Sequence, residues 1–308
     1  MIPMSSLLAA FVPIWILTAA GYLTARSGLL GEQAEAVLGR FVFHVAMPAT
    51  LFTMLARTPL SSFASTAMIA FAAGTALVCA LGLLAGRFLF HRPLADQAIS
   101  GMTAGYVNSA NLGIPVALQV LGDASFVAQV VLFQVLFVTP VILTLLDSGT
   151  TGLRRMLTMP IRNPIIIASA LGALFSATHL HLPAALTHSC DLLGAAAVPT
   201  ALVTLGISLH GRGTGQRLTP EVGVAVLLKT LAQPLIALAA ATLLLHLPPH
   251  QLLAVVLCSA LPTAQNAFIY ARQYNLSTTL ARDSVMFSTL ASMGTLSLIY
   301  GTLGPTHH

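Results

Sequence analysis

The stretch "GYVNSANLGIPVALQ", residues 105–119, interrupts a long apolar segment with groups that a continuous membrane helix does not need. It contains two carboxamides, Asn108 and Asn111, followed by a glycine and by Pro115. A proline inside a helix removes a backbone N–H donor and clashes with the preceding turn. The stretch therefore predicts a helix that breaks midway along its length.

The composition indicates that lipid surrounds most of this chain. Of its 308 residues, 56% are hydrophobic and 7% are charged, and the mean hydropathy is +0.89. Soluble domains carry about 25% charged residues, so this chain could not cover its surface in water. The net charge of +5 comes from sparse arginines rather than from a basic patch, so we expect no nucleic-acid partner.

The sequence carries no motif of an enzyme. The three cysteines are isolated and lack the spacing of a metal site or of a disulfide framework. Hydrolase, metalloprotease and phosphate-loop signatures are missing as well. We therefore expect no metal, no cofactor and no enzymatic activity.

Ten apolar segments are long enough to cross a bilayer, which takes about 20 residues. They are residues 5–25, 34–56, 64–90, 97–121, 124–147, 162–180, 187–209, 219–246, 250–273 and 279–302. Short loops join them. The sequence thus predicts an all-α integral membrane protein with ten transmembrane helices.

The arginines are distributed unevenly between these loops. Loops that follow odd-numbered helices hold 11 of the 13 basic residues, whereas loops that follow even-numbered helices hold Arg57 alone. Basic loops stay on the cytoplasmic side of a membrane. Both termini are therefore expected outside the cytoplasm, and the link 148–161 inside.

The chain also repeats itself at a spacing of 151 residues. From residue 13 to 53, comparing residue n with n+151 gives 12 identities in 41 positions without a gap. The informative matches are prolines and glycines, because alanine and leucine coincide by chance here. They are Pro13 with Pro164, Gly21 with Gly172, and Pro48 with Pro199.

Such a unit holds five helices, and an odd number of spans turns the second copy upside down. We therefore predict two inverted five-helix repeats, residues 1–150 and 151–308, the plan of many secondary transporters. The alternative is that prolines and glycines are simply frequent in membrane helices.

A second break is predicted at the matching place of the second repeat. The stretch "SALPTAQNAFIYA", residues 259–271, carries Pro262, Gln265 and Asn266. Pro115 and Pro262 each suit the first position of a new half-helix, and two half-helix N-termini meeting at the midplane favour an anion. The alternative is a pair of proline kinks whose amides tie helices together.

The motifs "NSANLGIP" and "LPTAQNAFIYA", within ten helices and short loops, resemble the auxin efflux carrier family. That family shares a superfamily with the bile-acid sodium symporters. The resemblance implies a scaffold part and a transport part, each drawn from both repeats, with helices 4 and 9 crossing at their breaks beside the substrate. It places the crossover asparagine at Asn111 and the crossover prolines at Pro115 and Pro262.

The resemblance also implies transport of organic anions, auxin in plants and dicarboxylates such as malonate or malate in bacteria. Plant exporters have a long cytosolic loop between helices 5 and 6, where this chain has only residues 148–161. It is therefore similar to the compact bacterial members, for which we expect a location in the bacterial inner membrane and a homodimeric assembly.

Other polar residues inside the predicted spans are further candidates. Lys229 lies about ten residues into helix 8, where a charge costs roughly 2.5–3.5 kcal/mol on insertion scales. It is expected to pair with a substrate carboxylate or to replace a coupling ion, with snorkelling to the interface as the alternative. Gln129, Gln134 and His44 are candidates for lining the transport path, and interhelical hydrogen bonding is the alternative for the two glutamines.

These features predict a secondary transporter, more specifically an exporter of small organic anions such as malonate or auxin-like acids, working by alternating access. The predicted substrate-binding residues are Asn108, Asn111, Pro115, Pro262, Gln265, Asn266 and Lys229. Coupling to protons or sodium is left open. The alternatives are a sodium-coupled importer of the bile-acid symporter type and, from another class, an intramembrane sensor or enzyme.

Overall fold

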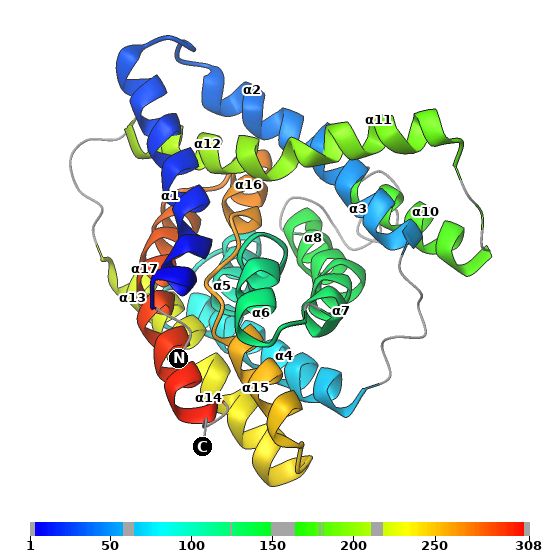
Figure 1. The fold of residues 1–308 in the computed structure, drawn as a ribbon. Helices are drawn as coiled ribbons and strands as arrows, with labels where there is room; N and C mark the ends of the chain where they lie inside the picture. Colours follow the sequence, from blue (N-terminus) through cyan, green and yellow to red (C-terminus); the bar gives the residue numbers. More distant parts are fainter. Residues whose placement is uncertain are drawn as a thin grey trace.

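The computed structural model describes residues 4–57, 65–123, 125–148, 164–178, 180, 182–210 and 218–304. Figure 1 shows how the helices are arranged. Nearly all of the expected cytoplasmic link 148–161, together with Arg212 and Arg217, lies outside these residues.

Apart from one isolated bridge, the regular structure in these residues is helical. The α-helices are α1 (Met4–Ser27), α2 (Ala34–Phe41), α3 (Met47–Arg57), α4 (Thr66–Phe88), α5 (Leu94–Gly105), α6 (Ile114–Val120), α7 (Ser125–Phe133), α8 (Thr139–Ser148), α10 (Pro164–Thr178), α11 (Ala184–Ala195), α12 (Ala197–His210), α13 (Pro220–Leu227), α14 (Gln233–Ala239), α15 (Pro249–Ser259), α16 (Asn266–Gln273) and α17 (Thr279–Leu303). Wider π-helical turns are η1 (Val42–Ala46), η3 (Ser109–Gly113), η4 (Gln134–Val138), η6 (Leu228–Ala232) and η7 (Ala240–Leu244).

Six continuous helical stretches of the described residues could cross a membrane, by length and composition. They are Ala34–Arg57, Thr66–Phe88, Ser125–Asp147, Ala184–Ile207, Pro220–Leu244 and Thr279–Leu303. Two shorter apolar helices, α10 and α15, accompany them. The prediction of an all-helical membrane protein is therefore confirmed, whereas the number of ten spans stays a prediction.

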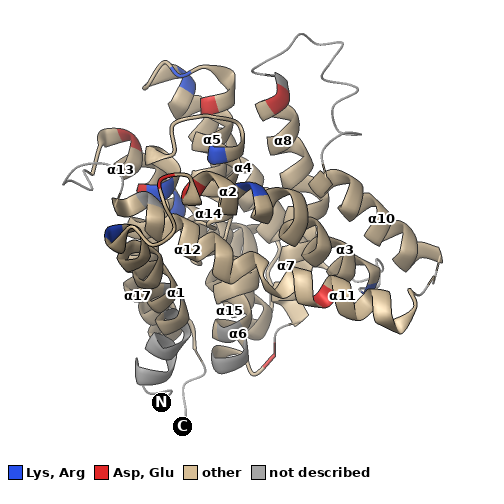
Figure 2. Cartoon of the chain, turned by 90° about the horizontal axis from the view of Figure 1, so that it is seen from above, with Lys and Arg blue, Asp and Glu red and all other residues tan. Residues whose placement is uncertain are grey.

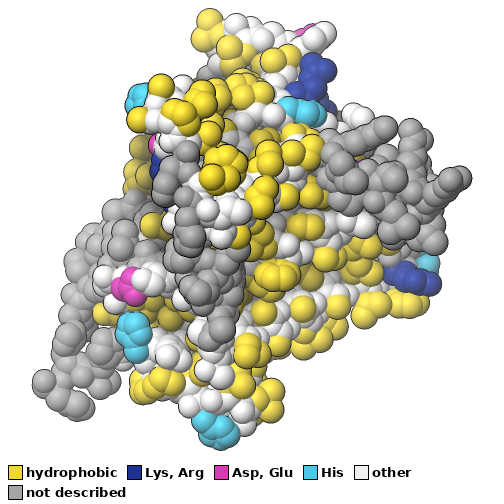
Figure 3. All heavy atoms as spheres, turned by 90° about the vertical axis from the view of Figure 1, so that its right-hand side faces the viewer, with side chains coloured by type: hydrophobic (Ala, Val, Ile, Leu, Met, Phe, Trp, Pro, Cys, Tyr) yellow, Lys and Arg dark blue, Asp and Glu magenta, His cyan; other side chains and the backbone are white. Residues whose placement is uncertain are grey.

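The surface fits a lipid environment. Large side chains such as Leu243, Leu244 and Leu298 are mostly exposed, and the face drawn in Figure 3 is dominated by hydrophobic atoms. Many charged residues lie toward one end, around the ends of α2, α5 and α13 and opposite the two chain termini, and a few others lie near α11 (Figure 2). This segregation is expected of a protein whose apolar belt lies in a bilayer.

Four of the π-helical turns share a cause that is visible in the sequence. Each of η1, η3, η4 and η6 ends two residues before a proline. The proline ring cannot tolerate a normally placed carbonyl in the preceding turn, and a wider turn moves that carbonyl away. The prolines are Pro48, Pro115, Pro140 and Pro234.

Two helices are broken outright, and their breaks lie against each other. Helix α5 ends at Gly105 and the helical path resumes at Ser109, while α15 ends at Ser259 and α16 begins at Asn266. An isolated antiparallel bridge joins the two breaks at Val107 and Thr263. The N–H of Asn108 donates to the Pro262 carbonyl at 2.8 Å, and the N–H of Ala264 donates to the Tyr106 carbonyl at 3.1 Å. Each break therefore satisfies backbone groups that lipid could not.

The prolines are placed differently from the prediction that each would begin a half-helix. Pro115 does lie in the first turn of α6, but helical turns already start at Ser109. Pro262 lies in the non-helical break, four residues before α16, and contributes its carbonyl to the bridge. A proline suits this position because it has no N–H to satisfy.

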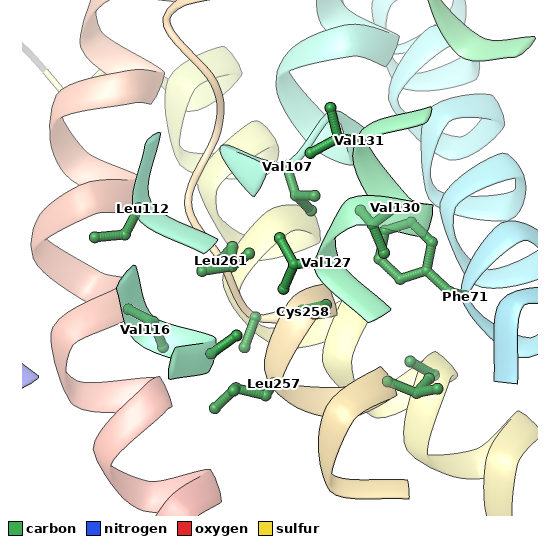
Figure 4. Packing of buried hydrophobic residues seen from close by; sticks show 14 of the residues in the cluster. Phe71, Val107, Leu112, Val116, Val127, Val130, Val131, Leu257, Cys258 and Leu261 are labelled. Carbon is green, nitrogen blue, oxygen red and sulfur yellow. The ribbon is translucent and has the colours of Figure 1, made fainter. Parts of the chain in front are cut away.

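A hydrophobic cluster packs under the breaks. Val107 and Leu261, one from each break, lie around Val127 of α7, with Leu112 and Cys258 nearby (Figure 4). All five side chains are almost fully buried. The backbone breaks are thus held on an apolar base and not only by their own hydrogen bonds.

Glycines bring two further helix pairs into close contact, α1 with α12 and α3 with α10. A Cβ atom added at Gly21 would overlap the carbonyl oxygen of Val203, and one added at Gly172 would lie 2.7 Å from that of Phe52. The two contacts correspond under a shift of 151 residues, because Gly172 follows Gly21 by 151 positions and Val203 follows Phe52 by 151 positions.

Candidate functional site

A cavity of about 80 Å³ lies beside the two breaks. It is lined by residues of both breaks, of α7 and η4, of α3, and of the α11–α12 segment. These are Met47, Thr50, Leu51, Met54, Tyr106, Val107, Asn108, Ser109, Ala110, Asn111, Val131, Gln134, Val135, Ala197, Val198, Ala201, Ala264, Gln265, Asn266 and Tyr270.

One wall of this cavity is polar and comes from the broken helices and η4. It carries five carboxamides, those of Asn108, Asn111, Gln134, Gln265 and Asn266. Four of them were predicted to bind substrate and the fifth to line the path. The breaks gather four of them because helical turns begin there at Ser109 and at Asn266, so that residues near each start face the same space.

The amides of this wall still have hydrogen-bonding capacity to offer. The Gln134 side chain donates from Nε2 to the Val107 carbonyl at 2.9 Å, which supports the first break. Among the described residues, Gln134 Oε1 and Gln265 Oε1 are buried without a hydrogen-bond partner. Buried polar atoms normally have partners, so these two acceptors point to water or to another hydrogen-bond donor in the cavity.

The part of the lining that comes from other helices is nearly all apolar. It comes from α3, with Met47, Leu51 and Met54, and from the start of α12, with Ala197 and Ala201. Thr50 is the polar exception, and its hydroxyl donates to the carbonyls of Ala46 and Gly194. A polar wall facing an apolar one lets the two sides separate at small cost, because few hydrogen bonds would have to break between them.

Within the described residues, the cavity lining includes no Asp, Glu, Lys, Arg or His. An anion bound here would be held by amides, by hydroxyls and by backbone donors. The first N–H groups of a helix lack intrahelical partners and carry partial positive charge. Two helical paths, at Ser109 and at Asn266, begin at this cavity.

Several predicted residues do not line the cavity. Pro262 shapes the second break instead, and the side chain of Pro115 lies outside the described residues. Gln129 accepts a hydrogen bond from Ser65 at 3.3 Å and braces α7 against the start of α4. His44 lies on the exposed side of η1, where Nδ1 contacts the Arg40 carbonyl. A role of Gln129 and His44 in the transport path stays a prediction.

Lys229 also lies away from the cavity lining. Its side chain is fully buried, and its ammonium donates to Oε1 of Gln233 and to the carbonyl of Ser259, the latter at 3.1 Å. Pairing with a substrate carboxylate stays a prediction, and the structure gives the ammonium two partners within the protein. The ammonium thus contacts the last residue of α15.

Sequence reasoning missed other residues of the polar wall. Tyr106 and Tyr270 line the cavity, and the Tyr106 hydroxyl lies 3.0 Å from Thr139 Oγ1. Ser109 lines it as well. A signal was available, since both tyrosines lie inside the two quoted motifs, but a sequence does not show which way a tyrosine side chain points.

A polar cavity beside paired helix breaks, inside an apolar helical protein, defines a membrane transport protein rather than an enzyme. The comparison with known families agrees. A family model described as "Membrane transport protein" matches residues 6–300, and the chain belongs to this family, which is the auxin efflux carrier family that its motifs resemble.

Individual relatives match along almost the whole chain. A protein of Rhizobium meliloti (strain 1021), named "Putative malonate transporter", is 28% identical over 313 residues, covering 96% of each chain. An "Uncharacterized transporter" of Methanothermobacter thermautotrophicus is 28% identical over 295 residues, covering 92% of this chain and 94% of the relative. The "Uncharacterized transporter YfdV" of Escherichia coli (strain K12) is 26% identical over 306 residues, covering 93% and 94%.

Proposed function

We propose that this protein is a secondary active transporter that exports small organic anions, with short dicarboxylates of the malonate class as substrates. The observation that carries the proposal is the amide-lined cavity at the two paired breaks. Helix N-termini and amides can together hold a carboxylate without a fixed counter-charge. The relative named for malonate supports the same substrate class.

The size of the cavity supports a small substrate. A water needs roughly 10–15 Å³ of such volume, so 80 Å³ accommodates about five to eight water-sized groups. A three-carbon dicarboxylate is of this size. An indole ring with an acetate arm is larger, which argues against auxin as the substrate.

The two unlike walls suggest how alternating access proceeds. In this proposal the broken helices and their neighbours form the transport part, and α1, α3, α10 and α12 belong to the scaffold part. The apolar wall would slide past the amide wall, exposing the cavity first to one side of the membrane and then to the other.

The proposal includes ten spans arranged as two inverted repeats, residues 1–150 and 151–308. The paired glycine contacts support it, because Gly21 with Val203 and Gly172 with Phe52 exchange roles under the same shift of 151 residues. A two-fold relation between repeats produces such reciprocal contacts. Chance matches between glycines do not require their partners to match as well.

Transport by the purified protein in proteoliposomes tests the function. Radiolabelled malonate, malate, acetate and indole-3-acetate are compared, with sodium and pH gradients imposed separately. Saturable movement of malonate, competed by other short dicarboxylates, is the expected result. Sodium-driven uptake would favour an importer of the bile-acid symporter type, and no flux of any carboxylate would reject the proposal.

The proposed topology places the protein in a bacterial inner membrane, with both termini on the side away from the cytoplasm. In a variant without the three native cysteines, Leu29→Cys between α1 and α2 should resist a membrane-impermeant maleimide added to intact cells. His246→Cys, between η7 and α15, should react. Both side chains are exposed, so access to the reagent depends on which side of the membrane each loop lies. The opposite labelling pattern would reverse the orientation.

A further inference from the structure

The chain's single lysine, Lys229, has a place in the fold that the cavity does not explain. It lies in the π-helical turn η6 and is fully buried. Gln233, one turn further on, is also fully buried and accepts a hydrogen bond from the ammonium. Together the two side chains form a polar pair inside the helical core.

This pair joins the ends of both broken helices. Lys229 Nζ donates to the carbonyl of Ser259, the last residue of α15, at 3.1 Å. Gln233 Nε2 donates to the carbonyl of Gly105, the last residue of α5, at 3.1 Å, and to Thr75 Oγ1 at 3.1 Å. One cation and one amide therefore cap the two half-helices on the side of the breaks opposite to the helix starts.

The electrostatics explain how a lysine is tolerated there. In the described part of the chain no Asp or Glu oxygen lies within 4 Å of the ammonium. The last carbonyls of a helix lack intrahelical partners and carry partial negative charge. The compensation for Lys229 thus comes from helix ends and not from a carboxylate.

In broken-helix transporters generally, half-helix C-terminal ends and unwound carbonyls are the groups that hold a coupling cation. Here the lysine ammonium contacts these groups directly. Ser259 adds a buried hydroxyl that has no partner among the described residues. The position is therefore rich in oxygen acceptors and already holds the Lys229 amino group.

We propose that the Lys229 ammonium is a built-in cation that takes the place of a coupling metal ion between the ends of α5 and α15, so that the carrier works without sodium. This rests on the proposed transport function. The Lys229 amino group stays between the two breaks whether or not substrate is bound, through its contacts with Gln233 and with the Ser259 carbonyl. If a bound metal ion filled this position instead, the contact between the ends of α5 and α15 would depend on the sodium concentration.

Thermal unfolding of the purified protein tests the placement of the cation. Wild type, Lys229→Ala and Leu143→Ala are melted in sodium chloride and in choline chloride at equal ionic strength. Lys229→Ala leaves the acceptors of Ser259 and Gln233 without their donor, so sodium should raise its Tm by at least about 2 °C relative to choline. Wild type and Leu143→Ala, a buried truncation in α8, should melt equally in both salts.

Malonate flux in the same two salts tests the consequence for transport. Wild type should transport equally in sodium and choline, whereas Lys229→Ala should lose at least about tenfold in choline and recover part of the loss in sodium. If Lys229→Ala does not fold, Lys229→Ser repeats both measurements with a hydroxyl as an additional sodium ligand.

Three results would overturn the inference: a sodium requirement in wild type, sodium stabilising the variant no more than wild type, or full transport by Lys229→Ala in choline. The melting experiment does not depend on the substrate. Absence of carboxylate flux in wild type, with the expected melting pattern, would therefore count against the proposed function alone.

Discussion

Replacing Asn266 or Asn111 by alanine is expected to reduce malonate transport by roughly 10- to 150-fold while the protein still inserts and folds. Both side chains line the cavity and are only partly buried, so neither is needed to fill the core. A hydrogen bond to a charged group contributes roughly 1.5–3 kcal/mol, which corresponds to that range of affinity. The measurement is the concentration dependence of malonate flux in proteoliposomes.

Gln129→Ala is the matched control, because it removes the same amide group from a position of α7 that does not line the cavity. Its partner, Ser65 Oγ, keeps its bond with the N–H of Met68. Transport by this variant should stay within about twofold of wild type, given that an exposed or half-buried hydrogen bond contributes little. Equal losses in the control and in the two asparagine variants would show that the substrate site lies elsewhere.

Gly206→Leu is expected to prevent the protein from folding stably. A Cβ atom at this position would overlap the carbonyl oxygen of Thr18 in α1. Backbone atoms cannot move aside as a flexible side chain can, so α1 and α12 would have to separate. Overpacking of a core typically costs about 1–3 kcal/mol of stability and occasionally more. We expect a cost at the upper end of this range, because the overlap is with the backbone of a neighbouring helix.

Gly294→Leu in α17 provides the comparison, because nothing lies within 4 Å of a Cβ atom added there. It adds the same side chain to a membrane helix without a steric conflict. Size-exclusion profiles and thermal unfolding in detergent should show loss of the folded species for Gly206→Leu and a near-normal melting curve for Gly294→Leu. A stable Gly206→Leu protein would mean that α1 and α12 pack less closely than the structure has them.

Much of the helical plan follows from the sequence alone. Apolar runs of about 20 residues must become helices in lipid, because only a helix satisfies every backbone group within one segment. The breaks were predictable for a similar reason: a proline near carboxamides disrupts a helix and supplies groups that can compensate. Asn108, Asn111, Gln265 and Asn266 were predicted in this way, and all four line the cavity.

The tertiary structure decided which polar residues share a space. Gln129 and Gln134 lie on the same helical segment and look alike in sequence, yet only Gln134 lines the cavity. The apolar wall from α3 and α12 had no sequence signal, since methionine and alanine are ordinary in any membrane helix.

The position of Lys229 depended most on the fold. In the sequence, Lys229 is a single basic residue within an apolar segment, and this suggested a substrate carboxylate as its partner. Its actual partners include the carbonyl of Ser259, 30 residues away, and through Gln233 the carbonyl of Gly105, at the end of the other broken helix. Backbone carbonyls belong to every residue, so no sequence pattern identifies the ones that packing leaves at a helix end beside a charge.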